Sequence, residues 1–183
     1  MTDYVEMSEG WMHPPEMEFI RECVRSSRAQ SKLILEVGCW KGRSTSALAN
    51  EGFVFCVDWF HGGLTTPESN WTMPEFVNNM DKVGALKKTV ILPMVSTEAL
   101  PLLRQFGIRF GTVFLDADHT ELSVERDLEL VWPLLESGGL LIVDDYEPAG
   151  NHPGVIVAAD KFMKTRGLAI ERCVGKDISI RKP

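Results

Sequence analysis

The chain has 183 residues, of which 44% are hydrophobic and 25% are charged, and its formal net charge is -7 at pH 7. This length and balance are typical of one globular domain with a sizeable core, and the acidic excess argues against a surface that binds nucleic acid. The N-terminus lacks the pattern of a signal peptide, and no apolar run approaches the roughly 20 residues that span a bilayer. We therefore expect a soluble, cytoplasmic protein that binds neither nucleic acid nor membrane.

The cysteines also indicate a reducing compartment. Cys23, Cys39, Cys56 and Cys173 form no C-x-x-C pair, and Cys39 and Cys56 lie in or beside apolar runs. This spacing favours buried free thiols over a zinc site.

Apolar runs alternate with amphipathic stretches along the chain. A proline-started helix is expected over residues 15–28, within an N-terminal helix and lid segment at 1–31. Short, nearly continuous apolar runs predict buried parallel strands; they cover 33–37, 53–58, 89–94, 112–116 and 140–144. Helical patterns lie between them, at 43–50, 74–83, 98–106 and 121–137.

The last helical pattern contains its own stop signals. Pro133 is expected to kink or break that helix, and the pair Gly138-Gly139 is expected to end it. Further on, residues 169–174 and 178–181 flank Gly175-Lys176-Asp177 and predict two strands joined by a tight turn. The alternation predicts an α/β fold with right-handed crossovers and a hairpin at the end of the chain.

The first predicted strand leads into an unusual glycine loop, in the stretch LILEVGCWKGRSTSALA. Glu36, Gly38 and Gly42 form the pattern E-x-G-x-x-x-G, but Trp40 stands where a nicotinamide dinucleotide loop needs a glycine. A P-loop motif is absent as well. We therefore expect the two glycines to let the backbone approach a ligand without phosphates, and Glu36 to accept a hydrogen bond from an ammonium group.

Asp58 narrows the identity of that ligand. It ends the second predicted strand, 20 residues after Gly38, where an acid accepts hydrogen bonds from the ribose hydroxyls of an adenosine. A phosphate-free adenosine with a charged amino-acid tail is S-adenosylmethionine.

A second group of acids follows the fourth and fifth predicted strands. Asp116 and Asp118 end one strand and Asp144 and Asp145 end the next, and the separation of 28 positions from Asp116 to Asp144 leaves room for one crossover helix. The four carboxylates should therefore share one rim and need a counter-charge, which no lysine or arginine within either motif supplies. Oxygen ligands favour Mg²⁺ or Ca²⁺. An acidic rim that binds a cationic substrate or caps a helix is the alternative.

The motifs together resemble the class I S-adenosylmethionine-dependent methyltransferases. EVGCWKG resembles their first motif, CVDWF their second-strand motif, and VFLDADHTELSVERDLELVWPLLESGGLLIVDDY the block between the fourth and fifth strands of small bacterial metal-dependent O-methyltransferases, the macrocin and novobiocin sugar type. GWMHPPEM and NHPGVIVAADKFM are similar to the flanking segments of that group. The resemblance implies a Rossmann-like doubly wound, mostly parallel seven-stranded sheet with a C-terminal antiparallel hairpin and helices on both faces, in one domain at 1–183 whose core is 32–183.

The resemblance also assigns site residues. Asp116, Asp144 and Asp145 match the metal ligands, and Asp118 matches a proposed general base, for which the neighbouring His119 is an alternative if its imidazole is neutral. The implied cofactors are S-adenosyl-L-methionine and Mg²⁺. The expected cofactor contacts are Glu36, Gly38, Cys39, Trp40, Gly42, Ser44, Asp58, Trp59, Ser96 and Asp116.

Several of these contacts have a structural alternative. Trp40 and Trp59 are also compatible with simple packing. Ser44 is equally suited to cap the following helix, and Ser96 to cap the helix at 98–106. Glycine and aromatic residues at 59–73 and at Gly10-Trp11-Met12 suggest lid elements.

The resulting hypothesis is a methyltransferase that methylates a hydroxyl of a small acceptor, of the sugar or phenol type, with Mg²⁺. A metal-independent N-methyltransferase and a non-catalytic S-adenosylmethionine-binding module are the alternatives. The sequence leaves the oligomeric state open, with a homodimer as one option.

Overall fold

The computed structural model describes residues 10–62 and 71–183. The strands are β1 (Leu33–Val37), β2 (Phe53–Asp58), β3 (Thr89–Pro93), β4 (Phe110–Leu115), β5 (Leu135–Val143), β6 (Ile170–Val174) and β7 (Asp177–Arg181). The helices are α1 (Pro14–Ser26), α2 (Arg43–Glu51), α3 (Met73–Lys82), α4 (Ser96–Gln105), α5 (Glu121–Val131) and α6 (Pro153–Arg166), with a 3-10 turn η2 (Leu86–Lys88). All five expected parallel strands and the expected terminal hairpin are present.

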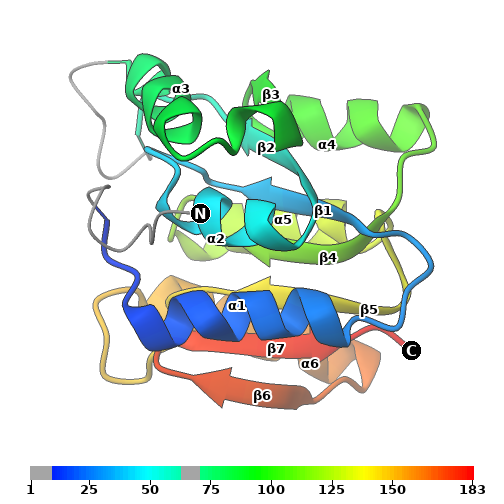
Figure 1. Ribbon diagram of the computed structural model, residues 1–183. Coiled ribbons are helices and arrows are strands. Elements are labelled where there is room, and N and C mark those ends of the chain that lie inside the picture. Colours follow the sequence, from blue (N-terminus) through cyan, green and yellow to red (C-terminus); the bar gives the residue numbers. More distant parts are fainter. Residues whose placement is uncertain (1–9, 63–70) are drawn as a thin grey trace.

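Within the described residues the strands form one sheet in the order β3-β2-β1-β4-β5-β7-β6 (Figure 1). The central strand β1 pairs in parallel with β2 on one side and with β4 on the other. β7 pairs antiparallel with both β5 and β6. The predicted doubly wound sheet with an antiparallel hairpin is confirmed, and chain order reverses beside β1, where open α/β sheets bind ligands.

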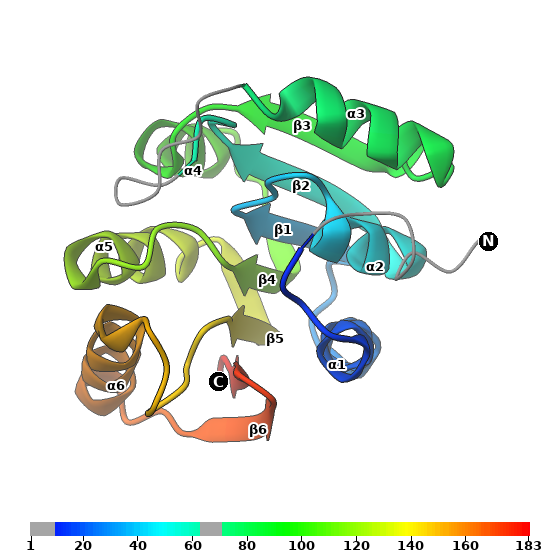
Figure 2. The ribbon, with the colours of Figure 1, turned by 90° about the vertical axis from the view of Figure 1, so that its left-hand side faces the viewer.

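Helices cover both faces of this sheet. Figure 2 shows α1, α2 and α3 on one face and α4, α5 and α6 on the other. Successive side chains of a strand point to opposite faces, so Leu35 and Val37 pack in one buried apolar cluster and Ile34 in the other. The near-continuous apolar strands of the sequence are explained by this two-sided burial.

The prediction for Gly138-Gly139 is wrong. α5 already ends at Val131, before Pro133, and the glycine pair lies inside β5 rather than at a helix end. There the register with β4 shifts between Phe110 and Thr112, and a Cβ at Gly139 would lie 2.8 Å from the carbonyl oxygen of Gly111. The glycines therefore permit a bulge and a close strand approach.

α6 covers a stretch that the sequence pattern marked only as a flanking segment. It begins at Pro153, a favourable first-turn residue, and ends at Arg166, followed by Gly167, whose φ of 62° is the left-handed conformation common just after a helix. No helix in the described ranges is long and apolar enough to cross a membrane.

The cysteines are free, as predicted. Cys23, Cys39 and Cys56 are buried and Cys173 is exposed. Cys39 and Cys56 lie close to Glu36, but burial raises the pKa of both thiols.

Candidate functional site

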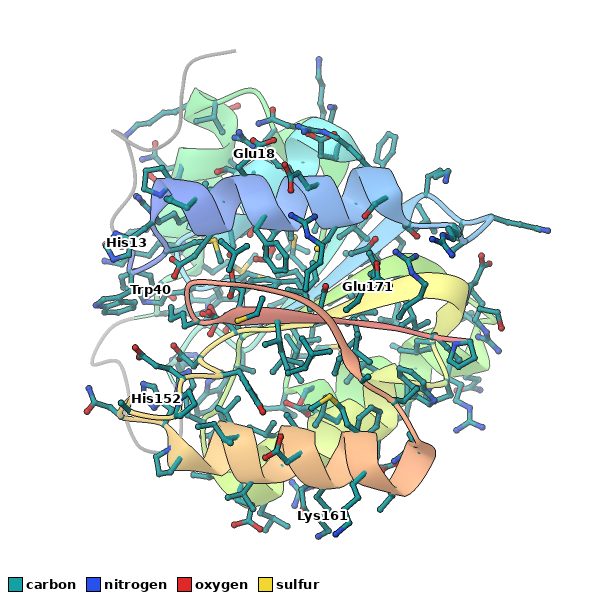
Figure 3. The ribbon with its side chains drawn as sticks, turned by 90° about the horizontal axis from the view of Figure 1, so that it is seen from below. His13, Glu18, Trp40, His152, Lys161 and Glu171 are labelled. Carbon is teal, nitrogen blue, oxygen red and sulfur yellow. The ribbon has the colours of Figure 1, made fainter. Side chains whose placement is uncertain are left out.

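The site lies where the loops after the parallel strands meet. The loop between β5 and α6 is at the left edge of Figure 1. Figure 3 places Trp40, on the loop after β1, and His152, just before α6, at one edge of the molecule, with His13 beside Trp40.

The glycine loop after β1 is shaped by contacts with the rest of the protein. Gly38 has a φ of 90°, and a Cβ there would lie 1.6 Å from the carbonyl oxygen of Asp116. Gly42 has a φ of 91°, and a Cβ there would lie 2.6 Å from Cε of Met80. Both glycines were expected to admit a ligand. The described contacts show a further need, because each glycine lets the loop approach the protein's own chain. The ligand contact stays a prediction.

Asp58 holds this loop in place. Its Oδ2 accepts hydrogen bonds from the backbone N–H groups of Cys39 and Trp40, both at 2.7 Å, and its Oδ1 accepts one from Phe60 N at 2.6 Å. These bonds maintain Trp40 at a φ of 41°, which is uncommon for a residue other than glycine. A carboxylate has about four lone-pair sites, so the predicted ribose contact is compatible with this structural role and stays a prediction.

Glu36 is fully buried beneath the loop. Ser44 Oγ donates a hydrogen bond to Glu36 Oε1, while Oε2 has no hydrogen-bond partner within the described part of the chain. Burial raises the pKa of Glu36 to about 8. The alternative that Ser44 caps the helix is wrong, because the cap residue of α2 is Gly42 and no side chain caps it.

Replacing Glu36 by glutamine is expected to flatten the pH dependence of folding stability in the ligand-free protein. The raised pKa means that the folded state holds an extra proton between about pH 4.5 and 8, so the contribution of Glu36 to stability is fully present below that window and is lost as the pH rises through it. Glutamine does not titrate. Urea unfolding at several pH values across the window measures the slope, with Glu98→Gln on the exposed side of α4 as the control. Equal slopes for wild type and Glu36→Gln would contradict the assignment.

The predicted carboxylates do meet at one rim. β4 and β5 pair in parallel with Leu115 opposite Val143, so Asp116 and Asp144 follow neighbouring strand ends. One oxygen each of Asp116, Asp144 and Asp145 lies within 4.8 Å of the others. Burial and the charge of Asp144 raise the pKa of Asp116.

A lysine from the far end of the chain supplies the counter-charge that the sequence motifs lack. Lys176 Nζ, on the turn between β6 and β7, lies 2.9 Å from Asp144 Oδ2 and 2.6 Å from Asp145 Oδ1. Burial disfavours the ammonium form, but the two carboxylates outweigh burial and raise the pKa of Lys176. The counter-charge thus comes from a residue outside both motifs, and the metal stays a prediction.

Two histidines complete the rim. His119 Nε2 lies 2.8 Å from Asp145 Oδ2 and 3.7 Å from Asp116 Oδ1, and its ring stacks on His152 with centroids 4.0 Å apart. Burial opposes protonation of His119, but Asp116 and Asp145 outweigh burial and raise its pKa to about 10. A protonated imidazole cannot accept a proton, so this arrangement disfavours His119 as the base.

Asp118 stands at the start of α5. Its Oδ1 accepts a hydrogen bond from Thr120 N at 2.8 Å, and Thr120 caps the helix by accepting from Ser123 N. Asp118 lies between Asp116 and His119 in the sequence. Since His119 is disfavoured, Asp118 remains the candidate for the general base.

Sequence reasoning missed Asp177 as well as Lys176. Asp177 begins β7 and is fully buried. Burial and the neighbouring Asp144 raise its pKa, so it is held in its protonated form. The available signal was an acid at the start of a predicted strand. Because Lys176 and Asp177 fitted the predicted turn Gly175-Lys176-Asp177, their charges were not connected with the rim.

The remaining predicted positions have different surroundings. Trp40 stacks on Trp11 with ring centroids 4.7 Å apart, which ties the N-terminal segment to the loop. Trp59 is 42% exposed and its Nε1 donates to the carbonyl oxygen of Gly62. Ser96 is the first residue of α4, whose cap residue is Val95, and no side chain caps this helix, so the alternative role of Ser96 as its cap is wrong. The remainder of the expected lids, at 1–9 and 63–70, lies outside the described residues.

The chain matches a known family over most of this site. A family model described as a methyltransferase domain matches residues 35–146. No curated protein sequence gives a significant match.

Solved structures share the fold at low sequence identity. The O-methyltransferase NovP has a TM-score of 0.76 and 18% identity, over 92% of this chain and 79% of its own. The calicheamicin methyltransferase CalS11 has a TM-score of 0.71 and 15% identity, over 92% and 80%. TomG from Streptomyces achromogenes, an O-methyltransferase of tomaymycin synthesis solved with S-adenosylmethionine, has a TM-score of 0.71 and 16% identity, over 94% and 82%. The matched domain, the sheet order and these likenesses together show that the chain belongs to the methyltransferase-domain family and has the fold of the class I methyltransferases.

Proposed function

We propose that this protein transfers a methyl group from S-adenosylmethionine to a hydroxyl of a small acceptor, of the sugar or phenol type, with a divalent metal at the acidic rim. The observation that carries the proposal is the direct contact between the two halves of the site. Gly38, on the loop assigned to the cofactor, packs against the backbone of Asp116, the first residue of the rim. A methyl donor on the loop would thus lie beside an acceptor at the rim.

Solved structures with this fold support the choice of cofactor and acceptor. TomG was solved with S-adenosylmethionine, and an O-methyltransferase from Bacillus cereus with S-adenosylhomocysteine. CalS11 is described as a TDP-rhamnose 3'-O-methyltransferase. In this chain Glu36 is the candidate partner of the cofactor's ammonium group and Asp58 of its ribose.

The rim has the donors that a divalent metal requires. Asp116, Asp144 and Asp145 each offer one oxygen within 4.8 Å of the others, and the buried Oδ1 of Asp144 makes no hydrogen bond within the described residues. Carboxylate oxygens suit Mg²⁺. Bound there, the metal would lower the pKa of an acceptor hydroxyl.

The residues of this chain would then position the reactants for an in-line displacement. The loop after β1 would hold the cofactor and the rim would hold the acceptor, so that the acceptor oxygen could attack the methyl carbon from the side opposite the sulfur. The new O–CH₃ bond forms as the S–CH₃ bond breaks, which leaves the thioether S-adenosylhomocysteine. Asp118 receives the hydroxyl proton.

S-adenosylhomocysteine is expected to raise the melting temperature of the purified protein, and Mg²⁺ is expected to raise it further. A ligand that binds only the folded state stabilises by RT ln(1 + [L]/Kd), or about 2.7 kcal/mol at a hundredfold excess over Kd. A thermal shift measurement with NAD as the control ligand checks this result. No shift with S-adenosylhomocysteine would contradict the cofactor assignment, and no further shift with Mg²⁺ would contradict the metal.

One observation favours metal-independent methyl transfer as a second candidate. The Lys176 ammonium already balances Asp144 and Asp145. In that case methyl transfer continues in EDTA, to an amine or a hydroxyl. Methyl transfer by the wild type in EDTA and after Mg²⁺ is restored separates the two candidates, and a complete lack of turnover with any acceptor would favour a non-catalytic binding module.

A further inference from the structure

Lys176 pairs with two of the three carboxylates that would hold the proposed metal. Its Nζ lies 2.9 Å from Asp144 Oδ2 and 2.6 Å from Asp145 Oδ1, so a divalent cation held by Asp144 and Asp145 would lie beside this ammonium. We propose that Lys176 is a built-in counter-ion that a divalent cation must displace, so that cation binding and release of this side chain are one exchange. The inference rests on the metal part of the proposed function.

The backbone of Lys176 is held firmly in place. Tyr146 N donates to the carbonyl oxygen of Lys176 at 2.9 Å, and Lys176 N donates to Glu16 Oε1 at 3.5 Å. Glu16 is itself buried, and a Cβ at Gly175 would lie 2.4 Å from its Oε1. The turn is therefore fixed against α1 and the β5–α6 loop. Release of the ammonium requires only a rotation of the flexible side chain, which is 21% exposed and can reach water.

The charges of the rim explain why the ammonium lies there. Asp116, Asp144 and Asp145 are three acids, and the Asp144 side chain is only 3% exposed, so water cannot compensate its charge. Lys176 supplies a positive charge against two of them. A divalent ion placed beside this ammonium would meet like-charge repulsion in a poorly hydrated site.

A purely structural salt bridge would behave differently from a counter-ion. Its loss would lower stability but would not make the rim a better cation site. If Lys176 competes with a metal, its removal should instead raise the affinity of the rim for the cation, because Asp144 and Asp145 then lack a positively charged partner.

Calorimetric titration of the full-length protein with Mg²⁺, in the presence of S-adenosylhomocysteine, tests this sign. Lys176→Met is expected to bind Mg²⁺ at least about tenfold more tightly than the wild type, since one nearby opposite charge shifts a carboxylate equilibrium by one to three pKa units. Lys176→Arg keeps a positive charge and should show no such gain. Lys161→Met is the matched control, because Lys161 pairs with Glu125 on the outer side of α6, away from the rim (Figure 3).

A second measurement on the wild type does not depend on the variants folding. A short pulse of acetic anhydride, followed by mass spectrometry, reports how accessible each lysine amine is. Acetylation of Lys176 is expected to rise several-fold when Mg²⁺ is added, while acetylation of Lys161 should not change.

The outcomes separate this inference from the proposed function. Unchanged or weaker Mg²⁺ binding by Lys176→Met, or Mg²⁺ binding by the wild type without greater labelling of Lys176, overturns the inference and leaves the metal in place. Mg²⁺ binding by Lys176→Met alone supports the counter-ion and removes the metal from the wild-type function. If neither protein binds Mg²⁺, both ideas fail, and S-adenosylhomocysteine binding still decides whether the cofactor assignment holds.

Discussion

Replacing Gly38 by alanine is expected to lower the free energy of unfolding by roughly 4 kcal/mol or more and to abolish cofactor binding. The added Cβ would lie 1.6 Å from the carbonyl oxygen and 2.4 Å from the carbonyl carbon of Asp116, and Gly38 has a φ of 90°. Both sides of this clash are backbone, so no rotation of a side chain relieves it. Either the loop leaves β4 or the strand ends separate.

Gly107→Ala separates the clash from the cost of a positive φ. Gly107 has a φ of 70°, and a Cβ there would meet nothing within 4 Å. This control should lose only about 1 kcal/mol and should retain cofactor binding. Urea unfolding and calorimetry with S-adenosylhomocysteine measure the two effects. Similar unfolding free energies for the two variants would show that the loop adapts and that the close approach is not required.

Asp144→Asn is expected to lower methyl transfer by at least about 100-fold while affinity for S-adenosylhomocysteine stays nearly unchanged. Loss of groups that only support metal ligands already costs 10–100-fold, and this change removes a proposed ligand charge. The proposed cofactor contacts Glu36, Gly38 and Asp58 are on β1, the loop after it and β2, and are not altered. The matched control is Asp160→Asn on α6, an exposed carboxylate that accepts from the Tyr146 hydroxyl at 2.7 Å.

Asp118→Asn distinguishes proton transfer from metal binding. It should lower turnover without weakening Mg²⁺ binding, because Asp118 is outside the carboxylate trio. For both Asp144→Asn and Asp118→Asn, product formation is measured in EDTA and after Mg²⁺ is restored, and Mg²⁺ affinity is measured by titration. If Asp144→Asn turns over as fast as the wild type, Asp144 has no role in the reaction. If the wild type is fully active in EDTA, the metal-independent alternative is supported.

Much of the fold and part of the site were predictable because their signals are local. A strand buried on both faces has to be apolar at nearly every position, so LILEV and FVFCVD were recognisable without any tertiary information. The adjacency of Asp116 and Asp144 was also predictable, because a crossover of one helix brings consecutive parallel strands together. The pairing of β4 with β5 confirms that prediction.

Other features carried an ambiguous local signal. Gly138-Gly139 resembles a helix end, but in the structure it lies at an irregularity of β5, where the chain passes close to Gly111 of β4. That close approach depends on β4, which the local sequence does not show. Ser44 resembles a helix cap, but its hydroxyl pairs with Glu36 in the centre of the sheet. A short polar residue near a helix start fits both arrangements, and only the position of the neighbouring strand selects one.

The sequence by itself determined the layered α/β sheet, the loop after β1 and the edge at which the acids gather. All three depend on residues that are near one another in the chain or on the general handedness of crossovers. The tertiary structure alone decided how the acids are compensated. Lys176 and Asp177 lie more than 30 residues after Asp144 in the sequence and reach it only because β7 inserts antiparallel beside β5, with Ile178 opposite Val143. Electrostatic interaction depends on distance in space and on burial, and neither can be deduced from the spacing of charges along the chain.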